Sequence, residues 1–518
     1  MIRRHYRAVV ALPLTLIWLG SPALAQSQGT FVGVSTNPNA PPLSAASLNA
    51  AFGSKADTTN GVLTGPTLSG GSANGTVANS AIMTPQGATN ATTLANLLNV
   101  GGIFPDWFKT PADGDDDAPS IQRAINALCG TNSQTMRFYA RHYAINSAVT
   151  QTCVVNWKGE GWVEEVGAVY TGAGTWFDIG TAFISSLVPI TVSGVGATGS
   201  IFEDIAFDEP GMTASPVPVV NGSGRITGWS PASFTPASYN YIVMVDGAPG
   251  VLFRHIMLNG VNAGVVSVGS GRTGFFDIRG QAFQYLINVQ QSYDINRIVD
   301  VHEWPYWSSA DPVVQYQQSN SIVVDSFRND TPMWDRIFAF GVKAGIAFGN
   351  EPAGVTTGLA AGSIECDFVK YCLWDQADAS SRQITGQIAN LRSYSQAWTT
   401  VFGAAVAMIP GSAAIESDAS SILQIGNMEN FGSDYATING TVVQPSNITI
   451  ASLKIYEDQM SANSQIVRFV TTGNTGSMIS VSLPPILVGT VSGFTDTNTS
   501  PNGSGVGTFQ YNVPAVVH

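Results

Sequence analysis

Phe202-Glu-Asp-Ile-Ala-Phe207 is a six-residue phrase that recurs along this chain: apolar, any, polar, apolar, any and usually apolar. Close copies stand at 253–258 (FRHIML), 275–280 (FFDIRG) and 295–300 (INRIVD), and looser copies continue to 450–455 (IASLKI). Most copies are separated by one or two units of roughly 20–25 residues, which is the period of a solenoid. Short alternating apolar segments between turns indicate that each unit is built of β-strands. We therefore predict an all-β solenoid, whose long, one-sided surface suits a long ligand.

The composition agrees with a secreted β protein. Glycine makes up 54 of the 518 residues and charged residues only 11%, so the chain is rich in turns and poor in charge. The formal net charge of −13 argues against a nucleic-acid partner, because phosphate binding needs a basic surface.

The first 25 residues predict export. Arginines near the start precede an apolar run from Val9 to Leu19, and an Ala-x-Ala site ends at Ala25. This is the pattern of a secretory signal peptide cleaved near Ala25, which predicts a secreted, extracellular or periplasmic protein. A membrane anchor is the alternative, but the run is short for a span.

Four cysteines in an exported chain suggest disulfides. The local pairings are Cys129 with Cys153 and Cys366 with Cys372, and free thiols in the core are the alternative. Metal-binding CxxC spacing is absent and the five histidines are scattered, so we expect no structural zinc site.

Residues 26–100 are a low-complexity segment dominated by Gly, Ser, Thr, Asn and Ala. Its apolar residues are too sparse for a compact monomeric core. It is either a flexible linker or an intertwined stalk to which several chains contribute. The stretches 47–57 and 63–68 resemble the low-complexity shaft segments of phage tail fibres and tailspikes.

Residues 113–128 predict a short amphipathic helix. Asp117 can cap its start, Pro119 suits the first turn, and Ile121, Ala124, Ile125 and Leu128 fall on one face. Such a helix needs an apolar surface to cover, and the open end of a solenoid offers one.

This helix begins a series of phrases that resembles the opening of the pectate-lyase superfamily. The matching phrases, in order, are Gly114–Asp117, Ile121–Ile125, Phe138–Ile145 and Trp157–Gly161. Tyr139 and Arg141 depart from the family pattern, where proline and glycine are expected. The resemblance implies a right-handed parallel β-helix over 101–460 with a short N-terminal capping helix. Strand-like runs after it predict a β-rich C-terminal cap over 461–518.

The polar residues at the third place of the phrase are expected to be structural. Asp204, His255, Asp277, Arg297 and Asp367 would stack at one bend of successive coils and satisfy backbone groups there. Candidate functional residues are therefore sought where insertions interrupt the phrase, chiefly at 300–320 and 330–340.

Those insertions bring acids, a base and aromatic side chains close together in sequence. The candidate catalytic residues are His302, Glu303, Asp335 and Arg336. The candidate substrate-binding residues, whose rings would stack on sugars, are Trp304, Tyr306, Trp307, Trp334 and Trp374. The alternative is that these aromatic rings pack under their own loops.

Two reactions suit such a site. Hydrolysis needs two carboxyl groups, which Glu303 and Asp335 would supply. β-Elimination needs a base and a cation, which His302 and Arg336 would supply. Lyase chemistry that is assisted by Ca²⁺ would need clustered acids, to which Asp204, Asp208 and Glu209 contribute.

The sequence thus predicts a secreted polysaccharide-degrading enzyme, a polysaccharide lyase or a glycoside hydrolase. The N-T-D, D-D and G-H-G phrases of polygalacturonase-type hydrolases are absent from successive coils, which argues against that chemistry. The alternative function is a non-catalytic, tailspike-like homotrimer that binds or adheres to polysaccharide. Neither function involves nucleic acid or a membrane span.

Overall fold

The computed structural model divides the chain into two compact units, residues 1–97 and 98–518. In the first unit it describes only the antiparallel strands β1 (Ile82–Met83) and β2 (Thr92–Thr93), so the predicted signal peptide and most of the predicted stalk lie outside the described residues. The described parts of the second unit are 102–130, 134–163, 173–185, 187–349, 354–376, 384–418, 421–434, 436–440 and 446–456, with short strands at 465–469, 478–482, 486–488, 508–511 and 516–517.

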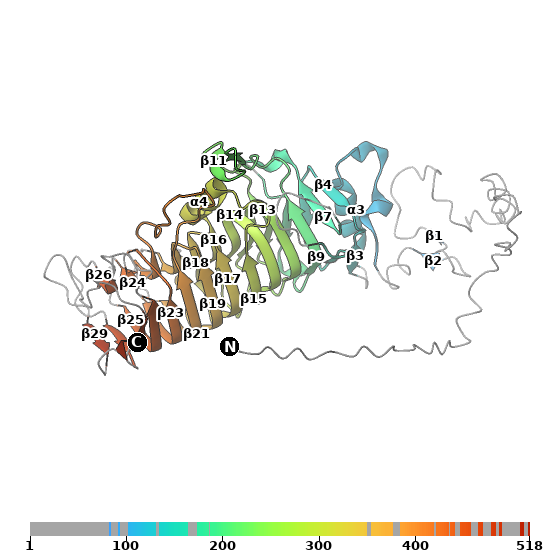
Figure 1. The fold of residues 1–518 in the computed structure, drawn as a ribbon. Coiled ribbons are helices and arrows are strands. Elements are labelled where there is room, and N and C mark those ends of the chain that lie inside the picture. The colour runs from blue at the N-terminus through green and yellow to red at the C-terminus, as the bar shows by residue number, and fades with distance from the viewer. Residues whose placement is uncertain are drawn as a thin grey trace, which may run out of the picture. The chain divides into compact units, whose positions relative to one another are not determined.

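The second unit is the expected right-handed parallel β-helix, whose coils stack from β3 at one end toward β25 at the other (Figure 1). One run of parallel strands, here called the bent sheet, consists of β3 (Thr135–Arg137), β6 (Asn156–Lys158), β9 (Ile201–Asp208), β13 (Leu252–Val268), β14 (Gly274–Ser292), β15 (Arg297–Glu303), β17 (Met333–Phe340), β19 (Leu359–Asp367), β21 (Ile384–Tyr394), β23 (Ser421–Asn430) and β25 (Asn447–Tyr456).

A second run, here called the second sheet, closes the other side of each coil. It consists of β5 (Val149–Gln151), β8 (Ile190–Ser193), β12 (Tyr241–Asp246), the later parts of β13 and β14, β16 (Ile322–Asn329), β18 (Ala344–Gly349), β20 (Tyr371–Asp375), β22 (Ala413–Ser417) and β24 (Ala436–Gly440).

Short elements complete the coils. They are β4 (His142–Ile145), β7 (Trp176–Ile179) and the 3₁₀ helices η1 (Pro105–Phe108), η2 (Pro111–Asp113), η3 (Thr181–Phe183) and η4 (Val195–Ala197). Beyond residue 460, parallel pairing continues through β26 (Gln465–Phe469), β27 (Met478–Val481), β28 (Ile486–Val488), β29 (Thr508–Tyr511) and β30 (Val516–Val517). The predicted boundary of a C-terminal cap at 460 stays a prediction.

In the coils from β9 to β17, the bent sheet turns sharply at one residue of each strand. Asp204, His255, Asp277, Asp300 and Arg336 all have positive φ angles, between 51° and 59°, and each interrupts the register of its strand. Left-handed backbone is enriched at Asp and His, whose short polar side chains tolerate it. This line of residues is called the bend row below.

The sequence prediction of the bend row is confirmed for Asp204, His255 and Asp277 and is wrong for Arg297 and Asp367. Arg297 pairs with Gly274 and lies three residues before the bend, where Asp300 takes the predicted place. Asp367 lies beyond its bend and pairs with Phe340. In the later coils the row continues through Ser363, Asn390, Asn427 and Ser452.

Aromatic rings from the first place of the phrase stack inside the helix. Phe202 lies 5.0 Å from Trp157 and 5.1 Å from Phe253, and Phe253 lies 5.2 Å from Phe275, measured between ring centroids. All four side chains are fully buried. The repeated aromatic position therefore supplies a continuous core, because each ring fills the space between those of its neighbours.

Helix α3 (Ala118–Leu128) lies at the N-terminal end and buries the predicted face of Ile121, Ala124, Ile125 and Leu128. Asp117 stands at the N-cap position, but its carboxylate makes no capping hydrogen bond. It accepts hydrogen bonds from Arg141, Lys109 and the backbone N–H of Ala144 instead. The capping role predicted for Asp117 is therefore wrong, and the residue ties the helix to the first coil.

Both expected disulfides form. Cys129, directly after α3, is bonded to Cys153, and Cys366 of β19 is bonded to Cys372 of β20. Among the described residues no cysteine is free. No helix within the described ranges is long and apolar enough to cross a membrane.

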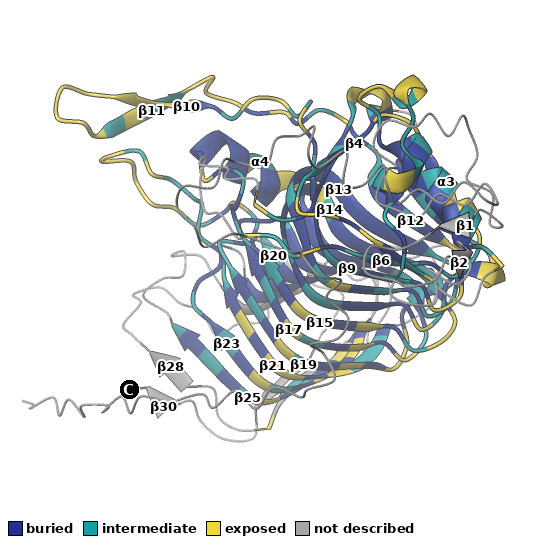
Figure 2. Ribbon diagram, turned by 90° about the vertical axis from the view of Figure 1, so that its right-hand side faces the viewer, coloured by how far each residue is buried: buried dark blue, intermediate teal, exposed yellow. Residues whose placement is uncertain are grey.

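Three insertions leave the coils at the same corner, where the bent sheet passes to the second sheet. They are residues 209–240, which carry the hairpin of β10 (Val217–Val220) and β11 (Ile226–Ser230), residues 304–321, which carry helix α4 (Asp311–Asn320), and residues 395–412. Figure 2 shows the hairpin extending beyond the stacked strands on the side where α4 lies. Asp311 accepts hydrogen bonds from Thr399 and Thr400, so α4 is tied to the third of these insertions, which lies three coils further along the chain.

Candidate functional site

The first group of predicted residues lies exposed at the bend. Arg336 donates hydrogen bonds to Asp335, at 2.9 Å, and to Asp300, at 2.6 Å. The side chains of all three residues are 40–56% exposed. The two aspartates therefore have a cation as their partner, and the guanidinium of Arg336 is occupied by carboxylates of the same chain.

His302 lies two residues past the bend and faces outward, with an aromatic group around it. Its Nδ1 atom is 2.5 Å from the hydroxyl of Tyr306, and its ring lies 5.9 Å from Trp304 and 5.0 Å from Phe338. Tyr306 itself is 1% exposed and packs in a cluster with Trp176 and Ala206. These rings form a small satellite core under the insertions.

Glu303 faces the interior. It is fully buried, and its Oε1 atom accepts hydrogen bonds from the backbone N–H of Ala282, at 3.0 Å, and from Gln317 of α4, at 2.9 Å. Burial raises the pKa of this carboxyl well above its ordinary value. Glu303 and the exposed Asp335 therefore do not face a common cleft.

The remaining predicted aromatics are scattered. Trp334 is 2% exposed and donates its indole N–H to Asn296 inside the coil. Trp307 packs on Phe283 of the bent sheet's continuation and on Phe234 of the first insertion. Trp304 packs on Phe340. Only Trp374 lies on the outer face of the second sheet, and the roles predicted for all five residues stay predictions.

That outer face gathers polar and aromatic residues along one line. In the second sheet, Val324, Ile346, Leu373 and Ile415 are register partners that are buried in the core. Because successive residues of a strand face opposite ways, the next residues point outward. These outward residues, called the acid row below, are Asn288, Asp325, Ala347, Trp374, Glu416 and Asn439.

Of the two carboxyl groups in the acid row, Glu416 has the more strongly raised pKa, and it lies beside another acid, Asp418. Glu416 is 4% exposed, and Asn439 donates to both of its oxygens at 2.9 and 2.8 Å. Burial, aided by the nearby Asp418 carboxylate, raises the pKa of Glu416 to about 8 against the effect of Asn439. Asp418 lies two residues along on the same face and accepts a hydrogen bond from the indole of Trp374 at 3.0 Å. Glu416 is therefore protonated at neutral pH beside a second carboxyl group.

Two lysines border this pair. The ammonium of Lys343 lies 4.1 Å from the ring centroid of Trp374, and that of Lys370 lies 5.3 Å from the ring centroid of Tyr371. Burial and the charge of Lys370 lower the pKa of Lys343. Tyr371 and Trp374 lie 5.7 Å apart, so the acids, the lysines and the two rings belong to one site.

A second carboxyl group lies further toward the N-terminus on the same face. Asp325 is 1% exposed, and burial raises its pKa to about 7. Asn288 donates hydrogen bonds to Asp325 and to the hydroxyl of Tyr241, which lies near the ring of Tyr285. Three strand spacings separate Asp325 from Glu416 in the register, which is roughly 14 Å.

No described residues form a metal site. The acids considered for calcium from the sequence do not gather: Asp204 is bound by Lys158 and His255, while Glu209 is 1% exposed and accepts a hydrogen bond from the backbone of Asn262. Burial raises the pKa of Asp208 to about 6. Within the described ranges, no three His, Cys, Asp or Glu side chains lie close enough together to hold an ion.

The sequence predictions did not include Asp325, Glu416 or Lys343. A signal was present, since Val323-Val324-Asp325 and Ala414-Ile415-Glu416 each place an acid in an apolar strand. A carboxyl group at such a position is expensive to bury unless it has a function or a partner. Ala414-Ile415-Glu416 lies between copies of the six-residue phrase, whereas Asp325 lies within a copy at 324–328 in which Ser326 is taken as the polar residue.

No protein-family model and no curated protein sequence matches this chain. Among solved structures, the chain is similar to the catalytic domain of a GH87 α-1,3-glucanase in complex with nigerose, with a TM-score of 0.47 and 14% identity over 76% of this chain and 66% of that one, just under two thirds. It is also similar to DFA-IIIase from Arthrobacter chlorophenolicus A6, with a TM-score of 0.38 and 10% identity over 77% and 87% of the two chains. A third similar structure is PfbA, a surface adhesin of Streptococcus pneumoniae, with a TM-score of 0.37 and 9% identity over 74% and 92%.

Proposed function

We propose that this protein is a secreted enzyme that binds a polysaccharide along the outer face of the second sheet and hydrolyses it at Glu416 and Asp418. The observation that carries the proposal is the pairing of a buried, protonated carboxyl group with a second, half-exposed carboxyl group two residues away. Hydrolysis of a glycosidic bond uses such a pair, one group as acid and the other as base or nucleophile.

The surroundings of the pair supply the other parts of a sugar site. The rings of Tyr371 and Trp374 offer flat apolar surfaces, and Lys370 offers a hydrogen-bond donor beside the acids. The acid row extends along several coils, and its most accessible members near Glu416 are Trp374 and the adjacent Asp418, so an extended polymer would lie across these side chains above the buried acids. Two disulfides support folding in an oxidising compartment, as the proposed secretion requires.

In the proposed mechanism, Glu416 donates its proton to the oxygen of the leaving sugar. Asp418, whose side chain shares a hydrogen bond with Glu416 in this structure, acts as a base toward water or as a nucleophile once the bound sugar has separated the two carboxyl groups. Asn439 holds the carboxyl of Glu416 in place through its amide N–H groups. Trp374 holds Asp418 through its indole N–H.

Binding without cleavage is the second candidate function, and the burial of Glu416 favours it. A carboxyl group that is 4% exposed with both oxygens hydrogen-bonded to Asn439 would also suit a purely structural role. In that case the acid row would only recognise the polymer, as in the tailspike-like homotrimer considered from the sequence.

The test is incubation of the purified protein with neutral and acidic polysaccharides. We expect new reducing ends without the ultraviolet absorbance of unsaturated sugars on at least one polymer. Unsaturated products would instead indicate elimination, for which Lys343 would be the base. Binding with neither product would overturn the enzymatic proposal in favour of the binding function.

A further inference from the structure

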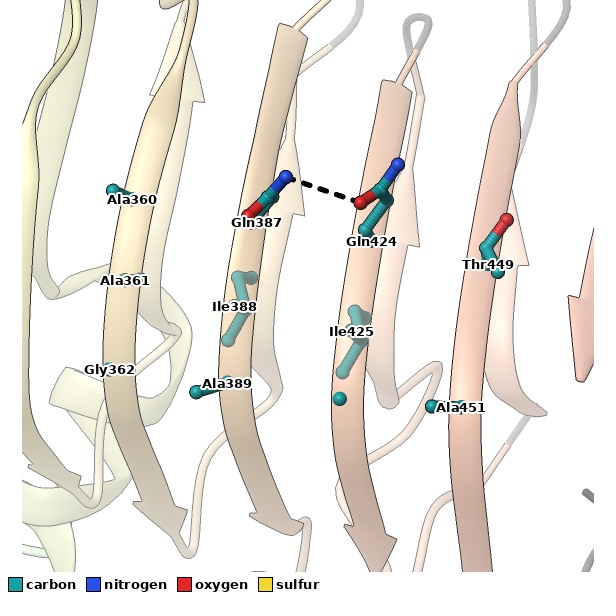
Figure 3. A pocket seen from close by; sticks show the side chains of 11 residues that line it. Ala360, Ala361, Gly362, Gln387, Ile388, Ala389, Gln424, Ile425, Thr449 and Ala451 are labelled. Carbon is teal, nitrogen blue, oxygen red and sulfur yellow. Dashed lines mark hydrogen bonds between the residues drawn. The ribbon is translucent and has the colours of Figure 1, made fainter. Parts of the chain in front are cut away.

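A groove lies on the other long surface of the molecule, on the outer face of the bent sheet just before the bend. It has a volume of about 560 Å³ and runs across β19, β21, β23 and β25 (Figure 3). This volume is within the range of sites that hold small ligands or segments of polymers. The residues that line it are Ala360, Ala361, Gly362, Gln387, Ile388, Ala389, Gln424, Ile425, Gly426, Thr449 and Ala451. It is called the amide groove below.

The floor of the amide groove is made of the smallest side chains. Gly362, Ala389, Gly426 and Ala451 each stand one residue before the bend row of their coil. A Cβ atom on Gly426 would lie 2.6 Å from the carbonyl oxygen of Ala389, so the backbones approach closely there. The floor is therefore open because no larger residue occupies this place in four successive coils.

Earlier coils fill the same place. The corresponding residues there are Glu203, Arg254, Phe276, Val299 and Asp335. The carboxylate of Asp335 closes the groove at its first coil, since a Cβ atom on Gly362 would lie 1.9 Å from Asp335 Oδ1. The groove is thus a local feature of the C-terminal half, bounded at one end by a charged side chain.

Two lines of amide side chains border the floor. On one side, Gln387 donates a hydrogen bond to Gln424 at 3.3 Å, and Figure 3 shows both side chains standing up from neighbouring strands. On the other side, Asn427 of the bend row donates to Asn390 at 3.0 Å. All four residues are exposed, so their remaining amide groups face solvent on both edges of the groove.

The uncharged side chains that line the groove favour an uncharged ligand rich in hydroxyl groups. None of the lining residues carries a charge, although the whole chain has a net charge of −13. Amides both donate and accept hydrogen bonds, as sugar hydroxyl groups require, and alanine methyl groups suit the C–H faces of sugar rings. The amides stand on the two middle strands, β21 and β23, about 4.8 Å apart, and Thr449 and Ser452 offer hydroxyl groups at the same places on β25, so neighbouring units of an extended polymer would meet similar partners.

We propose that the amide groove binds an uncharged polysaccharide strand that runs along the helix axis. This is a binding site separate from the acid row, because it lies on the bent sheet and contains no acid or base. It goes beyond the proposed hydrolysis, since it would hold the polymer without cleaving it. Loss of either site is therefore distinguishable from loss of the other.

The experiment measures binding of the full-length protein to soluble starch, dextran, mannan and mixed-linkage β-glucan, with alginate and polygalacturonate as anionic comparisons. Affinity electrophoresis or calorimetry gives the dissociation constant. Ala389→Phe places a ring on the exposed floor of the groove, and Ala405→Phe adds the same ring to an exposed loop as the matched control. We expect Ala389→Phe to weaken binding of a neutral polymer at least tenfold and Ala405→Phe to leave it unchanged.

A second variant keeps the test valid if Ala389→Phe fails to fold. Gln387→Ala combined with Gln424→Ala removes one amide edge without adding volume, and we expect it to weaken the same binding about fivefold or more. Unchanged binding in both groove variants, a preference for the anionic polymers or no binding to any neutral polymer would overturn the proposal. A change in solution mass caused by Ala389→Phe would also overturn it, because the groove would then hold a second copy of the chain.

Discussion

The outer faces of the two sheets differ in the exposure and ionisation of their carboxyl groups. Along most of the bent sheet, carboxylates and cations are exposed and paired with each other, as in Asp300 with Arg336 and Glu365 with Arg392; Asp208 at the end of β9 is an exception, since burial raises its pKa to about 6. On the second sheet, Asp325 and Glu416 are buried, and their pKa values are raised to about 7 and about 8. Exposed ion pairs on a surface contribute little and leave the acids ionised. Buried acids are costly, and shifted pKa values gather at functional sites, so the second sheet is the better place to look for chemistry.

The largest expected difference between the two faces is the loss of cleavage rate caused by Glu416→Gln on the second sheet. This change removes the proposed proton donor and keeps the shape of the side chain, so we expect the cleavage rate to fall about 10²–10⁴-fold. Polysaccharide binding should remain. The measurement is initial rates of reducing-end release, together with the dissociation constant for the same polymer.

Glu365→Gln on the bent sheet is the matched control, because Glu365 is an exposed acid paired with Arg392. We expect its rate to stay within about twofold of the unmodified protein. Equal losses in the two variants would remove the distinction between the faces.

The next largest effect is a dependence of the cleavage rate and of the stability on pH, which should come from Glu416 on the second sheet. The protonated fraction of Glu416 falls about tenfold per pH unit above its pKa of about 8, so the cleavage rate should fall likewise from pH 8 upward. Its folded-state pKa lies above the unfolded value of 4.5, so the folded state binds the extra proton. Stability from this group is therefore present at low pH and is lost as the pH rises from about 4.5 to 8.

The measurements are the pH profile of kcat/KM and the unfolding midpoint between pH 5 and 9. Glu416→Gln should flatten the second profile over this range. A rate that stays constant from pH 7 to 9.5 would exclude Glu416 as the acid.

A smaller effect is expected at the aromatic surface of the second sheet. Trp374→Ala removes a half-buried ring that lies beside the acids and donates to Asp418, so we expect KM to rise about tenfold, equivalent to about 1.4 kcal/mol. Trp374→Phe should restore part of the ring contact but not the hydrogen bond. If neither variant changes KM, the polymer does not contact this ring.

The smallest effect should come from the bend of the bent sheet. Arg336→Gln breaks an exposed ion-pair network with Asp300 and Asp335, and we expect the cleavage rate to change by less than about twofold. The same measurement on His302→Ala would examine the other outward-facing candidate from the sequence, which is partly buried among aromatic rings. A loss as large as that of Glu416→Gln in either variant would move the active site to the bent sheet.

The fold could be predicted because the same interaction repeats. Phe202, Phe253 and Phe275 occupy one place of the phrase, and a stack of rings is the natural result. The bend at 295–300 was placed wrongly because Arg297 occupies the polar third place of the phrase that begins at Ile295, and only pairing with β14 shows that Asp300 turns the strand. Patterns fix which residues repeat, whereas register depends on contacts with the next coil.

The candidate site was harder for the same physical reason. His302 faces outward and Glu303 inward because the left-handed residue Asp300 resets the alternation of the strand. A one-residue difference in that position would exchange the two side chains. Asp418 is close to Glu416 in the sequence, but the contact of Glu416 with Asn439 joins two strands that become neighbours only after the coils are stacked.

The stack of rings from Trp157 to Phe275 also determines the order in which the coils should unfold under a pulling force. Each coil of a solenoid contacts only its neighbours, so force applied along the axis acts on one interface at a time. Coils from β3 to β14 are joined by fully buried aromatic pairs, while those from β19 to β25 are joined by smaller aliphatic and alanine side chains. Pulled from the two ends, the molecule should unwind from its C-terminal coils and keep its N-terminal half as the last part to yield.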